Sequence, residues 1–310
     1  MKVHFGVDGG TAALERTIAS LGNYDGVHLG HQAVLQKTVE QARRLFLPSV
    51  AVTFDPVPKK ILYPETAPPL IQTVEQRLRK LELLGLDHSI VVAFDHHLAD
   101  KSPEDFVREY LTGILRIKGF VVGQNFSFGH QKKGNLSLLA KMGMELDFFV
   151  EAVPEIQVDG ARISSSLIRE MIRQGKMEKA RHYLGSPFAV IGSVVEGERL
   201  GGRLGIPTAN LDVENELLPA RGVYITLALL PSGSHPSVTN VGMRPTFGGQ
   251  KLTVEAHLID FSGDLYGQRM ELQFLRKLRD EARFSNADEL KAHILADIEA
   301  AKQHLRRADA

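Results

Sequence analysis

The stretch GNYDGVHLGH, residues 22–31, joins a predicted β-strand to a predicted helix that carries Leu35, Val39, Ala42 and Phe46 on one face. Its glycines permit a sharp turn and a close approach of the backbone to a ligand. Free N–H groups and the positive end of the helix dipole meet at this turn, and both favour an anion. The sequence therefore predicts a strand, turn and helix that bind an anionic group such as a phosphate.

Two histidines, His28 and His31, stand at the start of this predicted helix. A spacing of three residues puts both side chains on one side of the first turn. Two imidazoles there can donate hydrogen bonds to a phosphate whose charge grows in a transition state. The competing interpretation is a pair of solvated surface residues. A zinc site is disfavoured because no third ligand of suitable spacing accompanies the pair and the chain has no cysteine.

Strand and helix patterns alternate through the first half of the chain. Residues 50, 52 and 54 are apolar at period two, and apolar runs follow at 89–94, 120–122 and 148–150. Thr73 and Gln76 have capping-box spacing, and Ser102 precedes a proline at another predicted helix start. This order predicts an α/β domain with a Rossmann-like parallel sheet, an architecture typical of nucleotide binding.

The pattern changes after Gly185 and Pro187. Four β-type runs follow, separated by Gly and Pro turns, at residues 189–195, 224–230, 254–259 and 270–274. Short antiparallel strands of this kind usually close into a small barrel or sandwich. A final helix is expected from about Ser285. We therefore predict two domains, residues 1–186 and 187–310, the second mostly β with a C-terminal helix.

Composition limits the classes of function. The 310 residues suffice for two cores, and 37 basic residues balance 37 acidic ones, which leaves no global field for a nucleic acid. No stretch reaches the ~18 apolar residues of a membrane span, and an apolar leader is not seen at the N-terminus. We expect a cytoplasmic protein with no nucleic-acid or membrane partner.

A second polar motif lies in the β-rich half, where glycines at 197, 201, 202 and 205 precede Pro207, Thr208 and Asn210. Thr208 and Asn210, two apart in an extended segment, point the same way and offer neutral oxygens to a Mg²⁺ ion. Glu255 interrupts an apolar strand pattern. It is either a buried functional carboxylate or an ordinary outward-facing one.

Several motifs carry a resemblance that covers nearly the whole chain. In the first half they are residues 22–31, TFDPVP at 53–58, VVGQNFSFG at 121–129 and ISSSLIR at 163–169. In the second half they are GIPTAN at 205–210, GVY at 222–224, NVG at 240–242, RPTF at 244–247, VE at 254–255 and DLYG at 264–267. Together they resemble the bacterial bifunctional riboflavin kinase/FMN adenylyltransferase family, also called FAD synthetase.

The resemblance implies that the second half phosphorylates riboflavin to FMN with ATP and the first half adenylates FMN to FAD, releasing pyrophosphate. His28 and His31 would act on the triphosphate. The other phosphate-binding residues would be Gly22, Asn23, Asp25, Gly26, Arg162, Ser165, Ser166 and Arg169. The flavin slot of this site would be lined by Phe54, Pro56, Pro58, Asn125 and Phe128.

For the kinase, the resemblance makes Glu255 the base for the riboflavin hydroxyl, with Thr208 and Asn210 as ligands of the Mg²⁺ that accompanies ATP. The implied ATP-binding residues are Gly197, Gly202, Arg203, Gly205, Thr208 and Asn210. Arg279 and Glu281 would contact the flavin. Riboflavin, FMN and ATP are the expected small-molecule partners, with homo-oligomers or transient contacts with flavoproteins left open.

Val57 stands where this family usually has a histidine, which removes a polar contact on the flavin side. It motivates an alternative, a riboflavin kinase whose first domain is a degraded or regulatory nucleotide-binding module. A nucleotidyltransferase of another substrate class would leave the kinase motifs unexplained. A structural or nucleic-acid-binding protein has the least support.

Overall fold

The computed structural model describes residues 1–6, 14, 16–197, 205–246, 249–282 and 284–308. Its internal contacts divide the chain into two compact units. Unit 1 consists of Met1–Pro69 and Thr73–Ser165, and unit 2 of Leu70–Gln72 and Ser166–Ala310. The division between residues 165 and 166 groups residues by the contacts they make with one another. The expected domain boundary after residue 186 stays a prediction.

Unit 1 is built on a six-stranded sheet in which all strands are parallel, in the order β1-β4-β3-β2-β5-β6. This confirms the α/β architecture expected from the alternating pattern. The strands are β1 Lys2–Phe5, β2 Thr17–Leu21, β3 Ser49–Phe54, β4 His88–Val92, β5 Ile117–Gly123 and β6 Phe149–Val153. The short edge strand β1 has no counterpart among the expected strands.

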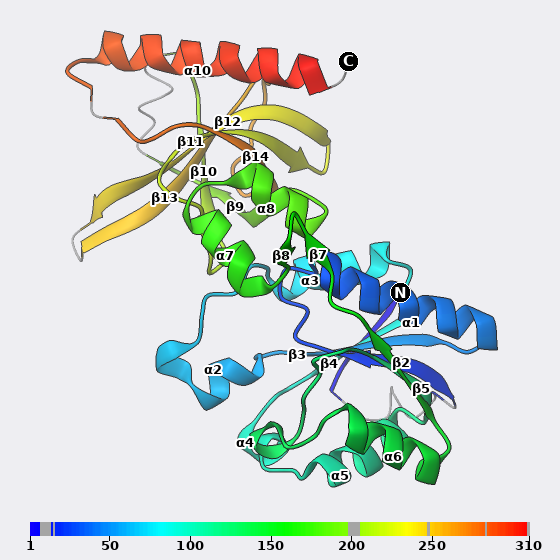
Figure 1. Ribbon diagram of the computed structural model, residues 1–310. Helices are drawn as coiled ribbons and strands as arrows, with labels where there is room; N and C mark the ends of the chain where they lie inside the picture. Colours follow the sequence, from blue (N-terminus) through cyan, green and yellow to red (C-terminus); the bar gives the residue numbers. More distant parts are fainter. Residues whose placement is uncertain (7–13, 15, 198–204, 247–248, 283, 309–310) are drawn as a thin grey trace. The chain divides into compact units, whose positions relative to one another are not determined.

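Helices cover both faces of this sheet, with α1 and α3 on one side and α5 and α6 on the other (Figure 1). The α-helices are α1 Leu29–Leu45, α2 Pro58–Leu62, α3 Val74–Leu83, α4 His96–Ala99, α5 Pro103–Phe106 and α6 Leu136–Leu146. Single 3₁₀ turns are η1 Pro64–Thr66 and η3 His130–Lys132, and η2 Val107–Ile114 is a π-helix. A small hairpin pairs β7 Gln157–Val158 with β8 Ala161–Arg162.

Side-chain alternation on β3 explains why both faces hold a core. Val52 packs in a cluster with Phe106 of α5, while the adjacent Ala51 packs with Leu35 of α1 and Leu81 of α3. The two helix starts expected from capping are confirmed, with the complete box at residues 73 and 76 and a serine cap at 102.

The expected place of Phe46 on the buried face of α1 is wrong. Phe46 caps the helix in the left-handed conformation, with φ of 55°, and its side chain is 95% exposed. The helix ends one residue before it, so the helical period no longer directs its side chain toward the core.

Unit 2 holds a closed antiparallel barrel in the order β10-β13-β12-β11-β14-β9. This confirms the expected β-rich half. The strands are β9 Phe188–Val195, β10 Ala209–Val213, β11 Gly222–Leu230, β12 Gly233–Thr246, β13 Gly249–Leu258 and β14 Arg269–Arg279. Among the described residues of this unit, the helices are α8 Met177–Leu184, α10 Ala287–Ala308 and, apart from its first residue, α7 Ser165–Arg173.

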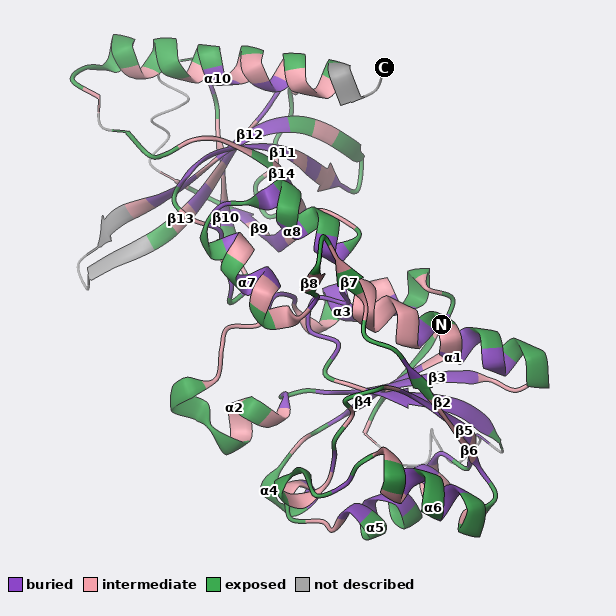
Figure 2. Ribbon diagram, in the orientation of Figure 1, coloured by how far each residue is buried: buried purple, intermediate pink, exposed green. Residues whose placement is uncertain are grey.

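The last helix, α10, packs on the barrel through Ile298, Ala301 and Leu305, which join barrel residues such as Val223 and Ile225 in one cluster. Its other side is exposed (Figure 2). Within the part of the chain that the structure describes, no helix is both long and apolar enough to cross a membrane.

Candidate active sites

The turn between β2 and α1 has an unusual backbone. Tyr24 and Val27 adopt positive φ of 47° and 42°, and Gly26 lies between them at 92°. Positive φ strains a β-branched residue such as valine, and strained backbone is concentrated at functional sites. Because the amide of Val27 donates to the carbonyl of Tyr24 at 3.1 Å, the turn is closed immediately before α1 begins.

The two histidines of this turn form a stacked pair. Their ring centroids are 3.7 Å apart with planes at 17°, and Nδ1 of His28 accepts the backbone N–H of His31 at 3.3 Å. His28 is therefore the N-cap of α1. A side chain at Gly30 would meet the His28 ring at 3.2 Å, so glycine leaves room for the ring beside the helix. The sequence prediction that both imidazoles share one side of the first turn is confirmed.

Burial keeps both imidazoles neutral. It lowers the pKa of His28 to about 4, and the positive charge of Lys80 acts in the same direction. Burial also lowers the pKa of His31 well below its usual range, and the positive charge of Arg77 lowers it further. Nδ1 of His31 is buried without a hydrogen-bond partner among the described residues. The pair thus presents neutral rings that can donate hydrogen bonds from fixed positions.

Two more residues expected to bind phosphate make polar contacts within unit 1. The Ser165 hydroxyl donates to the backbone carbonyl of Asp25 at 2.9 Å, which attaches the start of α7 to the turn. Arg162 forms an ion pair with Glu155 at 2.7 Å. Asn125, expected on the flavin side, donates to the same Glu155 carboxylate. Glu155, which the sequence motifs did not indicate, therefore contacts one residue expected to bind phosphate and one residue expected to bind the flavin.

Ser166 and Arg169 follow on α7 and belong to unit 2. Ser166 is exposed, whereas Arg169 is buried. Their role in phosphate binding stays a prediction.

Aromatic side chains gather beyond the carboxyl ends of the strands. Phe128 stacks on Phe126 at 5.6 Å and lies 5.9 Å from Phe106, which stacks on Tyr110 at 5.3 Å. Phe54, at the end of β3, meets Phe94 edge to face at 5.5 Å. Of the expected flavin-slot residues, the structure thus places Phe54 and Phe128 in aromatic clusters.

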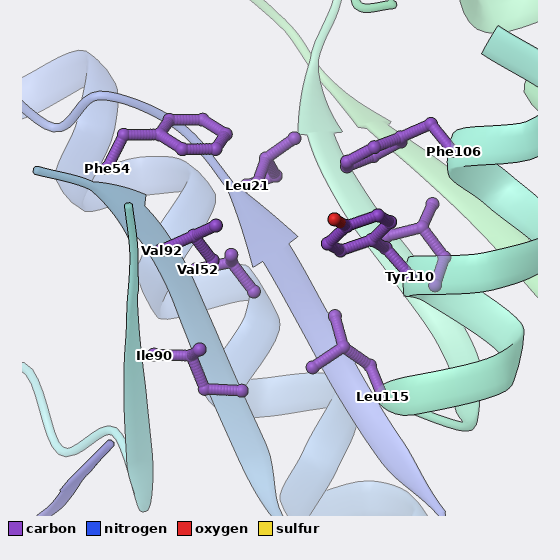
Figure 3. Close-up of a pocket in the computed structure, with 9 residues that line it drawn as sticks. Leu21, Val52, Phe54, Ile90, Val92, Phe106, Tyr110 and Leu115 are labelled. Carbon is purple, nitrogen blue, oxygen red and sulfur yellow. The ribbon is translucent and has the colours of Figure 1, made fainter. Parts of the chain in front are cut away.

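A narrow apolar pocket lies beside this cluster, between the sheet and the π-helix η2 (Figure 3). Tyr110 projects toward the strands and supplies a hydroxyl among apolar groups (Figure 3). The lining residues are Leu21, Val52, Phe54, Ile90, Val92, Phe106, Tyr110, Leu111 and Leu115. The cavity is only about 10 Å³, which is room for about one water molecule, so these side chains fill the space between the sheet and η2.

The loop after β3 carries the two expected prolines and Val57. Pro56 follows a cis peptide bond and is exposed, while Pro58 begins α2 and is partly buried. Val57 is only 5% exposed and caps α2 without a side-chain hydrogen bond. Its side chain thus packs as an apolar residue where the resemblance leads one to expect a polar one.

In unit 2, three polar residues stand side by side on neighbouring barrel strands. Glu255 of β13 is in register with Asn210 of β10 on one side and with Asn240 of β12 on the other. All three are partly exposed, whereas the flanking Val254 and Ala256 are buried in the barrel. Directly opposed residues lie about 4.5–5.5 Å apart, so the carboxylate is placed between two amides on the outer face. Asn240 was not among the expected site residues, since only strand pairing reveals its position.

The glycine-rich segment comes close to Asn210. A side chain at Gly197 would lie 2.1 Å from the Asn210 amide nitrogen, so the backbone at Gly197 passes against this amide. The carbonyl of Pro207 accepts a hydrogen bond from His257 at 2.8 Å, which fixes the segment that leads to Thr208. Gly205 has a positive φ of 79°. Two expected ATP-binding residues, Gly202 and Arg203, lie outside the described residues.

The two residues expected to touch the flavin of the kinase have other partners in this structure. Arg279 pairs with Asp297 of α10, its Nη2 and Nε at 2.8 and 3.1 Å from Oδ2. Glu281 lies 3.8 Å from Arg221, and its carboxylate, like the Asn240 amide, lies against Gly242. Glu281 therefore stands close to the row of polar residues on the barrel, while Arg279 anchors the final helix.

Comparison with known proteins matches the two halves of the chain to two different families. A family model described as FAD synthetase matches residues 11–167, and one described as riboflavin kinase matches residues 184–305. The bifunctional riboflavin kinase/FMN adenylyltransferase of Escherichia coli (strain K12) is 36% identical over 94% of each chain. The enzyme of the same name from Pseudomonas fluorescens is 38% identical over 92% of each. The chain belongs to this bifunctional family.

A solved structure has the same overall fold. It is described as a macrolide-efflux protein from Streptococcus pneumoniae and superimposes with a TM-score of 0.88 at 28% identity, covering 97% of this chain and 99% of that one. The family assignment places the His28 and His31 turn in the range matched by the FAD synthetase model, and the row around Glu255 in the range matched by the riboflavin kinase model.

Proposed function

We propose that the chain converts riboflavin to FAD at two separate ATP-using sites, the β2–α1 turn of unit 1 and the outer barrel face around Glu255 in unit 2. The neutral, stacked pair of His28 and His31 is the observation that carries the assignment of the first site. The assignment of the second depends on the register that places Glu255 between two asparagines.

At the first site the reaction is an in-line displacement. An oxygen of the FMN phosphate attacks the α-phosphorus of ATP, the bond to the pyrophosphate oxygen breaks, and pyrophosphate leaves. His28 and His31 donate hydrogen bonds to the triphosphate as its charge redistributes, and the N–H groups at the start of α1 add to them. Ser165, held on the carbonyl of Asp25, contributes a hydroxyl beside the same turn.

The flavin of FMN is proposed to bind on the aromatic side of the same unit. Phe54 and Phe128 offer ring faces and edges against which a flavin can stack. Pro56 and Pro58 border this side, and Asn125 supplies one amide for a polar group of the flavin. Val57 adds apolar surface and no hydrogen bond.

At the second site, Glu255 is proposed to accept the proton of the riboflavin 5′-hydroxyl as its oxygen attacks the γ-phosphorus of ATP and ADP leaves. Thr208 and Asn210 offer neutral oxygens and Glu255 stands opposite Asn210, a donor set that fits Mg²⁺. A bound Mg²⁺ would neutralise charge on the phosphates. Asn210 and Thr208 would hold it, while Gly197, Gly202, Arg203 and Gly205 would contact ATP and Arg279 and Glu281 the flavin.

One incubation tests this proposal. The purified chain is supplied with riboflavin, ATP and Mg²⁺, and the flavins are separated with time. FMN should appear first and FAD should follow. FMN without FAD would instead favour a kinase whose first unit is regulatory, and formation of neither flavin would overturn the assignment of both sites.

A further inference from the structure

The largest side chain that is completely buried in the described residues is that of Arg77 on α3. Its Nη1 donates to the Thr53 hydroxyl at 2.9 Å and to the Phe54 carbonyl at 2.8 Å. The Thr53 hydroxyl in turn donates to the carbonyl of Asn23 at 3.2 Å. One guanidinium therefore connects α3 to the end of β3 and, through one hydroxyl, to the turn that carries the histidines.

This cation is only partly satisfied. Nε and Nη2 of Arg77 are buried and make no hydrogen bond within the described part of the chain. The carboxylates of Asp25 and Asp55 favour its charged form, against the burial that lowers its pKa. Leaving buried donors unpaired costs stability, so a fold that keeps them at a functional site invites a functional explanation.

A second cation on the same helix reaches the same turn. Nζ of Lys80, one helical turn after Arg77, donates to the carbonyl of Gly26 at 3.3 Å. Residues three apart share a helix face, so α3 directs two positive groups at the turn between β2 and α1. The start of α3 is itself fixed by the complete capping box of Thr73 and Gln76.

The surroundings of His31 show what a fixed positive charge does there. The groups facing its ring are the stacked His28, the edge of Tyr24 at 5.5 Å and the positive charge of Arg77. The nearby cation disfavours a proton on His31, which keeps the ring neutral. Positive potential for a phosphate ligand is thus supplied by a guanidinium, which stays protonated at all working pH values.

We propose that Arg77 is a positioning residue of the adenylyltransferase site, where it holds the histidine turn and the Phe54 carbonyl in fixed relation. It touches no substrate. Through Thr53 it fixes the ATP side of the reaction, and through Phe54 the flavin side, so loss of its fork-shaped donor set misaligns the attacking and leaving groups. The inference rests on the proposed function of unit 1.

The test compares Arg77→Lys and Arg77→Met with Arg79→Lys and Arg79→Met in the full-length chain. Arg79 lies on the same helix, is half exposed and forms an ordinary i,i+4 ion pair with Glu75, which makes it the matched control. Formation of FAD from FMN and formation of FMN from riboflavin are measured separately. A misplacement of about 1 Å at a reacting centre costs about 100-fold in rate.

We expect Arg77→Met to lower kcat for FAD formation about 100-fold with a much smaller change in KM for ATP. Arg77→Lys should recover part of the loss, because an ammonium keeps the charge but not the fork. The Arg79 variants should match the wild type, and FMN formation should be unchanged in all four variants.

A pH profile separates positioning from simple support of the fold. Without the positive charge of Arg77, the pKa of His31 should rise. As the pH is lowered, His31 should then become protonated earlier, so FAD formation by Arg77→Met should begin to decline at a higher pH than FAD formation by the wild type or Arg77→Lys. Thermal unfolding is recorded for each variant. If Arg77→Met does not fold, reduced kcat in an Arg77→Lys variant with wild-type unfolding supports the proposal.

Wild-type kcat and pH profile in a folded Arg77 variant would overturn the inference and leave the proposed function intact. The same holds if the Arg79 variants lose as much activity as those of Arg77. A wild-type chain that makes FMN and no FAD would contradict the proposed function itself, and the inference with it.

Discussion

At the β2–α1 turn of unit 1 the polar groups pack against one another at a helix start, with His28 buried and His31 partly buried, whereas on the barrel of unit 2 they stand on the outer face of three adjacent strands. His28 and His31 stack at a helix start and are kept neutral by burial. Asn210, Glu255 and Asn240 are in register and partly exposed. Both sites are proposed to act on ATP.

The difference follows from what each fold provides. A parallel sheet ends in helix N-termini, whose N–H groups and dipole already favour phosphate, so the turn needs few charged side chains. An antiparallel barrel has no such helix start, so its site depends on side chains that strand pairing places side by side. Changes at the two sites should therefore separate the two reactions.

The largest difference between the two activities, FMN formation and FAD formation, is expected in Glu255→Gln. An amide cannot accept the hydroxyl proton, and loss of a general base costs about 10²- to 10⁴-fold in rate. FMN formation should fall by that amount, while FMN supplied directly should still become FAD. Glu271→Gln, on strand β14 outside the proposed site, is the control. An equal loss of both activities in Glu255→Gln would mean that the two sites are not separate.

His28→Ala should give the reverse pattern. It removes one donor to the developing charge and the N-cap of α1, and loss of one such donor costs about 10²- to 10³-fold. FAD formation from FMN should fall by that factor and FMN formation should be unchanged, as measured with flavin chromatography. Unchanged FAD formation would remove the stacked pair from the mechanism.

The sequence predicted those features that depend on neighbours within a few residues. The place of His28 and His31 at a helix start, and the capping box at Thr73, follow from spacing along the chain. The end of α1 does not follow from spacing, because the helix stops at Leu45 and leaves Phe46 exposed.

Features that depend on distant residues could not be predicted in this way. Asn240 becomes a neighbour of Glu255 only when β12 pairs with β13, and nothing in the local sequence of either strand gives that register. Arg77 lies in a helix rich in charged residues and would be read as solvent-exposed, although it is fully buried. Glu155 likewise meets Asn125 and Arg162 only in the folded unit.

A pH dependence of stability should be seen in unit 1. His28 has a pKa of about 4 in the folded state and about 6.5 when unfolded, so between these values the unfolded chain binds a proton that the folded chain does not. The free energy of unfolding should therefore fall as the pH falls from about 6.5 to 4, by about 3 kcal/mol for this group.

His28→Asn should make this dependence shallower, since asparagine caps the helix but does not titrate. Denaturant unfolding of unit 1 at several pH values measures it, with His97→Asn, at an exposed histidine of the same unit, as the control. Equal slopes in His28→Asn and the wild type would show that burial of this imidazole does not contribute.

The smallest effect is expected at the glycine beside the stacked pair. In Gly30→Ala the added methyl meets the His28 ring at 3.2 Å, so the ring must shift slightly, at a cost of roughly 0.5–1.5 kcal/mol or about 2- to 10-fold in FAD formation. Alanine also favours a helix by roughly 1 kcal/mol over glycine, so the unfolding temperature should not fall. Reduced activity in a variant at least as stable as the wild type would show that the rate depends on the ring position itself.

In Gly197→Ala the methyl would instead lie 2.1 Å from the Asn210 amide, and the loss should fall on FMN formation alone. If both substitutions slowed the same reaction, the contrast between a stacked histidine pair at a helix start and a row of side chains on a barrel face would not describe how this chain divides its two reactions.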